Sequence, residues 1–243
     1  MVRDLIIDYK YFYSVFYVIF LAMEGKGKRK LPSWMLTNKE NSVSDCKDQK
    51  QSKLNEVPNL IFEGKTVYCH MKDECNFICE ELNAISRKRQ VVLGFDIEWR
   101  AFTSGECTKT SIMQLCLSNR KCYVFQLSVM PKFPSELQLL LENEAIVKVG
   151  VGIDGDINRL VSEGSIKSPK SCIDLSKLAN EKLGNCERWS LNGLLMNQHQ
   201  RMLVKDTKLR CSNWDNYPLT DKQLDYAVLD AYAGLLIYQK LNS

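Results

Sequence analysis

Carboxylates are the side chains of this sequence best suited to chemistry. Asp96 and Glu98 lie two residues apart in the apolar run 91–99, a pattern typical of a buried strand. Side chains alternate between the faces of a strand, so both carboxylates point the same way, about 7 Å apart. Burying two carboxylates is costly unless a cation lies between them, and Mg²⁺ prefers oxygen ligands. An acidic pair facing solvent on an edge strand is the alternative for this pair alone.

Two other segments carry functional groups at informative spacings. Tyr226 and Asp230 are four residues apart in a predicted helix, which places a phenol and a carboxylate on one helix face. Asp154 and Asp156 lie in a glycine-rich turn between a predicted strand and a predicted helix. Spacing alone does not decide which of these two acids would join the others.

The same turn supports a rival interpretation. Residues 150–155 match the GxGxxG pattern, and Asp174 follows about 20 residues further on, as in dinucleotide-binding proteins. That pattern places a pyrophosphate at the helix N-terminus, where Asp154 and Asp156 would repel it. The charges therefore favour a helix terminus near a metal over a dinucleotide site.

Composition excludes several classes of function. The chain has 243 residues, with 33 Lys plus Arg, 29 Asp plus Glu and two His. His-rich zinc sites are excluded, and any Ser-His-Asp or Cys-His triad must use His70 or His199. A net charge of +4 requires that a polyanion be held by a local patch. The ten cysteines form no CxxC pair and lie mostly in apolar runs, which favours small buried residues in a reducing compartment.

The elements that must position these residues occupy 60–243. Strands are predicted at 66–70, 91–99, 112–117, 122–127 and 146–151, and helices at 73–87, 135–142, 155–163, 174–183, 190–198 and 220–241. Consecutive strands come first in this order, and alternating strands and helices follow. This order indicates an α/β protein with a mixed sheet flanked by helices. Ala227, Ala231 and Ala233 predict that the last helix approaches the sheet closely.

The first 59 residues differ from the rest. Residues 1–22 form an apolar extension, and the apolar run 11–23, which reaches one residue beyond it, is shorter than the ~18–20 residues of a spanning helix. It resembles a signal-peptide core without a cleavage site, and one hypothesis is that translation starts at Met23. No membrane partner is expected unless residues 1–22 are an anchor. Residues 23–59 are predicted to be a polar, basic, disordered tail, whose cluster 24–30 is either a nuclear-import signal or a solvated charge run.

Three segments together resemble the exonuclease motifs of the DEDD superfamily in its tyrosine subclass. They are Phe95-Asp96-Ile97-Glu98-Trp99, Gly152-Ile153-Asp154-Gly155-Asp156 and Tyr226-x3-Asp230. The similarity is closer still to Werner-syndrome-type exonucleases, and it runs from about residue 30 to the C-terminus. The resemblance implies a ribonuclease-H-like fold and a two-metal 3′–5′ exonuclease that uses Mg²⁺, with Mn²⁺ as a plausible substitute.

The resemblance also implies roles for individual residues. The expected catalytic set, metal ligands included, is Asp96, Glu98, Asp156, Asp230 and Tyr226. Asp96 would bridge two ions, Asp156 would hold an ion directly or through water, and Tyr226 would orient the attacking water. Asp154 is then the expected helix cap.

Residues expected to hold the substrate lie near the glycine turn and before the last helix. They are Asn158, Arg159, Lys205, Lys208 and Arg210. The cations would bind phosphates without reading sequence, although a solvated loop is the alternative for each. Asn158 stands where close relatives often carry an aromatic residue, so stacking on a terminal base is expected to be weaker or supplied elsewhere.

Three functions remain open from sequence. The first is a DNA 3′–5′ exonuclease that acts on overhangs or recessed duplexes in DNA repair, replication and genome maintenance. The second is an RNA-directed exoribonuclease of the ribonuclease D type, and the third is a non-catalytic nucleic-acid-binding or interaction module. DNA is the expected partner, with RNA as the alternative, and the nucleus is the expected location, with the cytoplasm as the alternative.

Overall fold

The structure is a computed structural model that describes residues 57–100, 108–204 and 206–243. The predictions for the apolar extension, the basic cluster and Lys205 therefore lie outside the described residues. Contacts divide the chain into Met1–Lys53 and Leu54–Ser243, and all described residues belong to the second unit. Within them, no helix is both long and apolar enough to cross a membrane.

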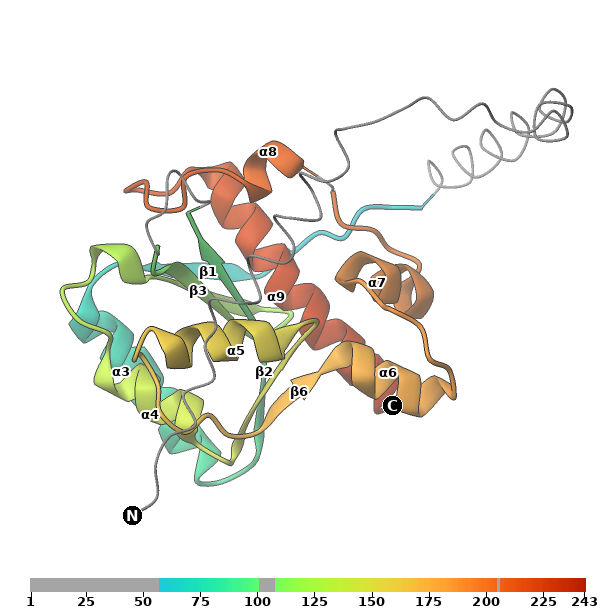
Figure 1. The fold of residues 1–243 in the computed structure, drawn as a ribbon, viewed down its shortest axis with the longest axis horizontal. Helices are drawn as coiled ribbons and strands as arrows, with labels where there is room; N and C mark the ends of the chain where they lie inside the picture. The colour runs from blue at the N-terminus through green and yellow to red at the C-terminus, as the bar shows by residue number, and fades with distance from the viewer. Residues whose placement is uncertain (1–56, 101–107, 205) are drawn as a thin grey trace, which may run out of the picture. The chain divides into compact units, whose positions relative to one another are not determined.

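A six-stranded sheet in the order β1-β4-β3-β2-β5-β6 forms the centre of the fold (Figure 1). Its strands are β1 (Lys65–Cys69), β2 (Val91–Trp99), β3 (Thr110–Ser118), β4 (Lys121–Gln126), β5 (Ile146–Gly150) and β6 (Cys172–Asp174). The pairs β2–β3 and β3–β4 are antiparallel, and the other pairs are parallel. The predicted mixed sheet is confirmed. Strand β6 was not predicted, because three residues are too few to show a periodic pattern.

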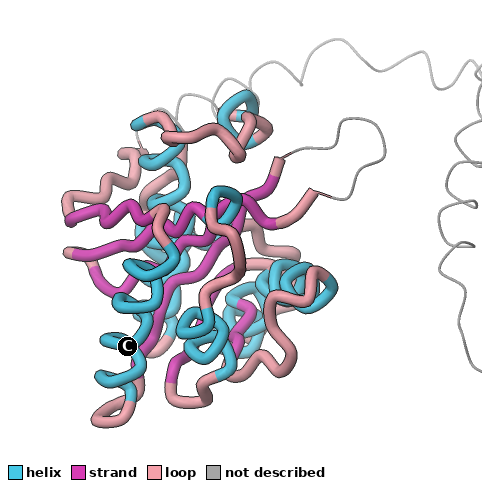
Figure 2. The backbone as a smooth tube through the Cα atoms, turned by 90° about the vertical axis from the view of Figure 1, so that its left-hand side faces the viewer, coloured by secondary structure: helices cyan, strands magenta, loops and turns pink. Residues whose placement is uncertain are grey.

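Helices cover both faces of this sheet (Figures 1 and 2). One face packs against α3 (Lys72–Ser86), α4 (Ser135–Glu142) and α5 (Ile153–Ser162). The other packs against α6 (Leu175–Leu183), α7 (Leu191–His199) and the long α9 (Asp221–Leu241). Two short helices, η2 (Leu127–Val129) and α8 (Thr207–Arg210), lie in the connections.

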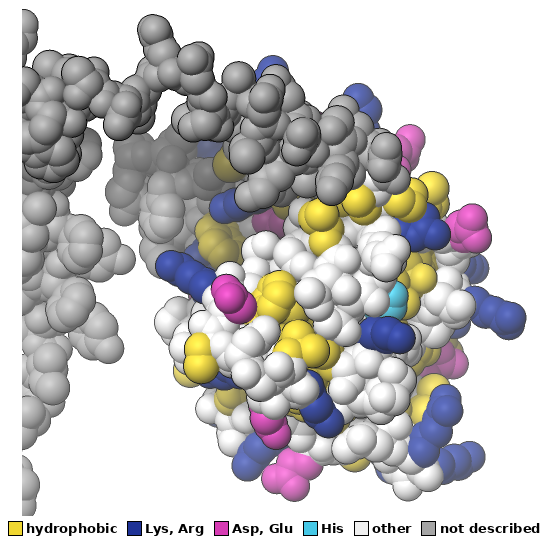
Figure 3. All heavy atoms as spheres, turned by 90° about the vertical axis from the view of Figure 1, so that its right-hand side faces the viewer, with side chains coloured by type: hydrophobic (Ala, Val, Ile, Leu, Met, Phe, Trp, Pro, Cys, Tyr) yellow, Lys and Arg dark blue, Asp and Glu magenta, His cyan; other side chains and the backbone are white. Residues whose placement is uncertain are grey.

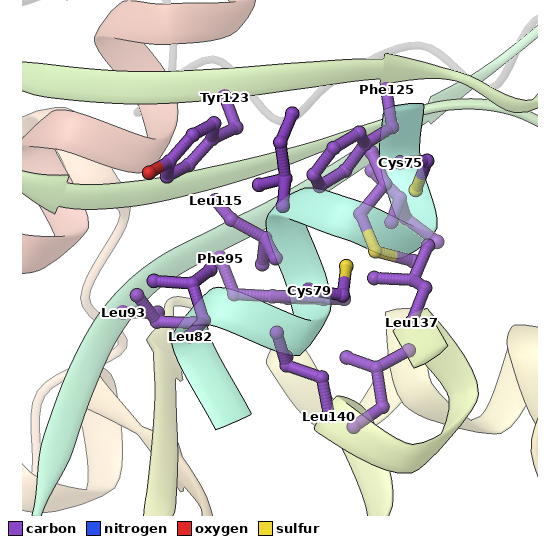
Figure 4. Packing of buried hydrophobic residues seen from close by; sticks show 14 of the residues in the cluster. Cys75, Cys79, Leu82, Leu93, Phe95, Leu115, Tyr123, Phe125, Leu137 and Leu140 are labelled. Carbon is purple, nitrogen blue, oxygen red and sulfur yellow. The ribbon is translucent and has the colours of Figure 1, made fainter. Parts of the chain in front are cut away.

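Strand β2 contributes to both faces. Leu93, Phe95 and Ile97 belong to the apolar cluster under α3, α4 and α5, where Figure 4 shows Leu93 and Phe95 among the helix side chains. Because side chains alternate along a strand, Asp96 and Glu98 point to the opposite face, which α9 covers. The predicted common face of the two carboxylates is confirmed.

Helix α9 begins at a capping box and packs very close to β2. Thr220 accepts a hydrogen bond from the Gln223 N–H, and the Gln223 side chain accepts one from the Thr220 N–H. The three alanines expected to keep the helix slim are fully buried. A Cβ at Gly94 would lie 1.9 Å from the Ala231 carbonyl oxygen, so only glycine permits this approach. This contact brings the functional residues of α9 next to those of β2.

The cysteines mostly serve as small core residues. The eight in the described part of the chain are free thiols. Those that are fully buried are Cys69, Cys75, Cys79, Cys116 and Cys122. This agrees with their prediction as small hydrophobic residues.

Candidate active site

A cavity of about 510 Å³ opens at the end of β2, where the predicted acids converge. Its lining includes Asp96, Glu98, Asp156, Tyr226 and Asp230. One carboxylate oxygen from each of Asp96, Glu98 and Asp230 lies within 4.8 Å of the others, and the described residues contain no second group of this kind. Three hard oxygen donors at this spacing suit a divalent cation.

Helix α5 brings the fourth acid to the cavity. Gly152 adopts a left-handed conformation with φ of 76°, which turns the chain from β5 into the helix. Its N–H donates to the Asp174 carboxylate at 2.7 Å, and Asp174 also caps α6. A carboxylate thus binds the amide that a dinucleotide phosphate would need, which counts against the rival interpretation. Asp156 then lies in the first turn of α5 and lines the cavity outside the three-acid group.

The prediction that Asp154 caps this helix is wrong. Helix α5 begins at Ile153 instead of residue 155, and Gly152 occupies the cap position without any side-chain cap. Asp154 is exposed and pairs with the Lys177 ammonium group at 2.5 Å. The error arose because the left-handed glycine starts the helix earlier, so that Asp154 turns to solvent while Asp156 turns to the cavity.

The three closest carboxylates resist ionisation together. Burial, and then the neighbouring carboxylates, raise the pKa of Asp96 well above its usual range. Burial raises the pKa of Glu98 to about 8; Asp230 adds to this shift and Arg210 opposes it. Burial raises the pKa of Asp230 to about 6, against the effects of a Tyr226 hydrogen bond and the Arg210 charge. A divalent cation would offset this repulsion, so the donor set fits a metal.

The pKa values of Asp156 and Tyr226 are raised as well. Burial raises the pKa of Asp156 to about 7, although the Arg159 charge opposes the shift. Burial, and then the Asp230 charge, raise the pKa of Tyr226 above its ordinary value. The phenol therefore stays protonated at neutral pH and can donate a hydrogen bond inside the cavity.

Comparison with known proteins shows the family to which this fold and these motifs belong. A family model described as 3′–5′ exonuclease matches residues 67–243, which include all the acids of the cavity. The chain belongs to the 3′–5′ exonuclease family. Members of this family hydrolyse phosphodiester bonds with the aid of divalent metal ions.

Sequence relatives of this exonuclease-family chain include proteins of very different length. The mouse bifunctional 3′–5′ exonuclease/ATP-dependent helicase WRN is 42% identical over 219 residues, which cover 89% of this chain and 16% of that protein. A 3′–5′ exonuclease of Arabidopsis thaliana is 35% identical over 192 residues, which cover 76% of this chain and 66% of that protein. The chain therefore spans a small part of the mouse protein and just under two thirds of the plant protein.

Solved structures support the exonuclease fold. RNase D of Escherichia coli matches with a TM-score of 0.61 at 20% identity, over 73% of this chain and 44% of that chain. The Nibbler EXO domain of Aedes aegypti matches with a TM-score of 0.62 at 22% identity, over 75% of this chain and 89% of that chain. At these identities the likeness concerns the fold, and it confirms the expected ribonuclease-H-like, DEDD-type architecture.

Trp99 lines the exonuclease cavity and was not among the predicted site residues. A register shift between Glu98 and Trp99 interrupts the ladder at the end of β2. The Arg159 guanidinium lies over the Trp99 ring, 4.2 Å from its centre, and its Nε is 2.9 Å from Glu163. Arg159 also donates to the Thr108 carbonyl. Arg159, expected to hold a phosphate, is thus engaged with the protein and supports the cavity wall.

The other predicted substrate residues are placed differently. Arg210 is exposed and lines the cavity, as its expected phosphate contact requires. Lys208 and Asn158 are exposed but line none of the described cavities, and Lys205 lies outside the described residues. On the face shown in Figure 3, Lys and Arg side chains are dispersed instead of gathered in one patch. Among the predicted cations that the structure describes, Arg210 lines the acid cavity, whereas Arg159 acts on Asp156 through its charge.

The start of α7 is a second part of the site that sequence reasoning missed. Ser190 and Leu191 line both the acid cavity and an adjoining cavity of about 380 Å³. Arg210, Tyr226 and Asp230 also line both, so the two cavities adjoin at Asp230, and the other three acids line the first cavity alone. The signal available in the sequence was the helix-capping serine, whose Oγ accepts the Gly193 N–H.

Proposed function

We propose that this chain is a divalent-metal-dependent 3′–5′ exonuclease that removes nucleotides from DNA 3′ ends at overhangs or recessed duplexes. The observation that carries the proposal is the convergence of the Asp96, Glu98 and Asp230 carboxylates within 4.8 Å. Tyr226 and Arg210 line the same cavity, and family membership supplies the reaction class.

The metal proposed is Mg²⁺, with Mn²⁺ as a substitute, because every donor in the group is a carboxylate oxygen. Two divalent ions held by Asp96, Glu98 and Asp230 would neutralise developing charge and lower the pKa of a bound water. Asp156 lies outside the three-acid group, which suits a ligand that acts through water.

The remaining side chains would hold and orient the substrate. Arg210 is exposed at the cavity, where its guanidinium can bind a phosphate without reading the base. The protonated Tyr226 hydroxyl can donate to the attacking water or to a phosphate oxygen. The acid cavity and the adjoining cavity that shares Asp230 with it offer room for the nucleotides that flank the cleaved bond.

DNA is proposed over RNA from the pattern of similarity. The relative at 42% identity joins a 3′–5′ exonuclease to an ATP-dependent helicase. Likeness to ribonuclease D, at 20% identity, concerns the fold alone. The proposed setting is DNA repair and replication in the nucleus, with the basic cluster 24–30 as the import signal and the cytoplasm as the alternative.

The test is digestion of an end-labelled, 3′-recessed DNA duplex and a single-stranded RNA of the same sequence. We expect stepwise shortening of the recessed DNA strand from its 3′ end with Mg²⁺ or Mn²⁺, and none with EDTA. An Asp96→Asn protein purified in parallel controls for contaminating nucleases. Faster degradation of RNA would overturn the DNA assignment, and full activity with EDTA would overturn the metal mechanism.

A further inference from the structure

Gln114 is a buried polar residue without a partner. It lies in the middle of β3 and is fully buried. Neither its side-chain oxygen nor its side-chain nitrogen has a hydrogen-bond partner among the described residues. An unpaired amide in a protein interior destabilises the fold, and such groups are rare unless they serve a function.

The β2–β3 register places this amide beside the acids. Asp96 of β2 lies directly opposite Gln114 of β3 in the antiparallel ladder. Directly opposite residues project to the same face, with their Cβ atoms about 4.5–5.5 Å apart. The neighbours of Gln114 on that face of β3, Ile112 and Cys116, pack into the apolar cluster against α9. Gln114 is therefore a polar residue between two apolar ones, next to one of the three carboxylates of the acid group.

A second buried glutamine shows that the fold can satisfy such a group. Gln126 of β4 lies opposite Ile112, so it shares the face of Gln114, and it is also fully buried. Its Nε2 donates to the Asn216 carbonyl at 2.6 Å, and its Oε1 accepts the Tyr68 hydroxyl. The unpaired amide of Gln114 is thus a feature of its place beside Asp96 and not of buried glutamines in this sheet.

We propose that Gln114 is a positioning residue whose side-chain N–H holds the Asp96 carboxylate in the orientation that ligates the metal. A carboxylate that gives one oxygen to a metal keeps further lone pairs for a hydrogen bond, and a primary amide can supply the donor. Hydrogen bonds to ligating carboxylates fix their orientation and strengthen metal binding. This inference rests on the proposed function, because it requires Asp96 to bind a metal.

The proposal predicts opposite effects on stability and on metal affinity. Gln114→Met keeps the length of the side chain and removes both unpaired polar atoms. The metal-free variant should unfold at the same temperature as wild type or about 2–4 °C higher, because the unpaired amide is gone. Its Mn²⁺ affinity should fall about 10- to 100-fold, because the Asp96 carboxylate loses its support. If Gln114 had a purely structural role, its replacement would not lower Mn²⁺ affinity while leaving the unfolding temperature unchanged or raised.

The experiment measures Mn²⁺ binding to the full chain by titration calorimetry, and thermal unfolding without metal. Gln114→Met and Gln114→Leu are compared with wild type, and Gln126→Met is the matched control. The control should lose stability, because the Asn216 carbonyl and the Tyr68 hydroxyl lose their partner, and it should keep wild-type Mn²⁺ affinity.

The outcomes separate this inference from the proposed function. Wild-type Mn²⁺ affinity in both Gln114 variants would overturn the inference, and so would failure of both variants to fold without metal. A wild-type protein that binds no Mn²⁺ and digests neither DNA nor RNA would overturn the proposed function itself. Weakened Mn²⁺ binding in both Gln114 variants, with the control unchanged, would support the inference.

Discussion

The two faces of β2 have opposite chemical character although their residues alternate along one strand. Phe95 and Ile97 belong to the buried cluster of aliphatic, aromatic and thiol side chains under α3 and α4, where Figure 4 shows Phe95. Asp96 and Glu98 lie on the other face, where burial, and then neighbouring carboxylates, raise their pKa values. Apolar burial stabilises the first face, whereas the second gathers carboxylates whose charge must be offset by bound protons or by a cation. Substitutions at adjacent residues of β2 should therefore affect different properties: activity on the acidic face and stability on the apolar face.

Asp96→Asn should produce the largest effect on activity. The neutral amide removes the central ligand of the acid group, and we expect exonuclease activity to fall by at least about 10²–10³-fold. The metal-free protein should be as stable as wild type or more so, because one repelled and buried carboxylate is gone. Nuclease assays and denaturant unfolding of the same preparation measure both quantities. Near wild-type activity would remove Asp96 from the mechanism.

Phe95→Ala, one residue away, should instead act on stability. Phe95 is 2% exposed and packs in the cluster under α3. Truncating such a side chain costs about 3–5 kcal/mol, which denaturant unfolding would detect as a lower midpoint. Molecules that remain folded should bind Mn²⁺ normally. Ile97→Val is the matched control and should cost about 0.5–1.5 kcal/mol. A folded Phe95→Ala protein with weakened Mn²⁺ binding would show that the two faces are coupled.

The same comparison explains what sequence could predict. The alternation along 91–99 and the four-residue spacing of Tyr226 and Asp230 are local, so the shared faces were predictable from the residues, whereas the convergence of the segments was expected from the family resemblance. The start of α5 was not, because it depends on Gly152 and on the hydrogen bond that its N–H donates to the Asp174 carboxylate, 22 residues away. The stacking of Arg159 on Trp99 likewise depends on a contact between distant segments.

Removal of the divalent ion should make stability depend on pH. The raised pKa values mean that the folded acids bind protons more tightly than the unfolded chain does. The free energy of unfolding without metal should therefore fall as pH rises from about 4, the usual carboxyl range, toward the Glu98 pKa of about 8. Saturating Mg²⁺ should flatten this decline, because bound ions displace the protons.

Thermal unfolding at a series of pH values, with EDTA or Mg²⁺, measures this slope. The series should stop below pH 8, because burial lowers the pKa of Lys148 to about 8 and its titration opposes the trend above that point. Glu98→Gln is the control and should reduce the decline near neutral pH. Equal slopes with and without Mg²⁺ would show that these acids do not bind the ion.

The smallest effect on activity is expected from replacing Asp154, which can be compared with Asp156 in the same helical turn. Asp154 and Asp156 both lie in the first turn of α5, but Asp154 is exposed and pairs with Lys177, whereas Asp156 lines the cavity. An exposed ion pair contributes little, so Asp154→Asn should change stability by less than about 1 kcal/mol and leave nuclease activity unchanged. Asp156→Asn should lower activity about 10- to 100-fold. Equal losses in the two variants would mean that charge at the start of α5, and not contact with the cavity, is what the reaction requires.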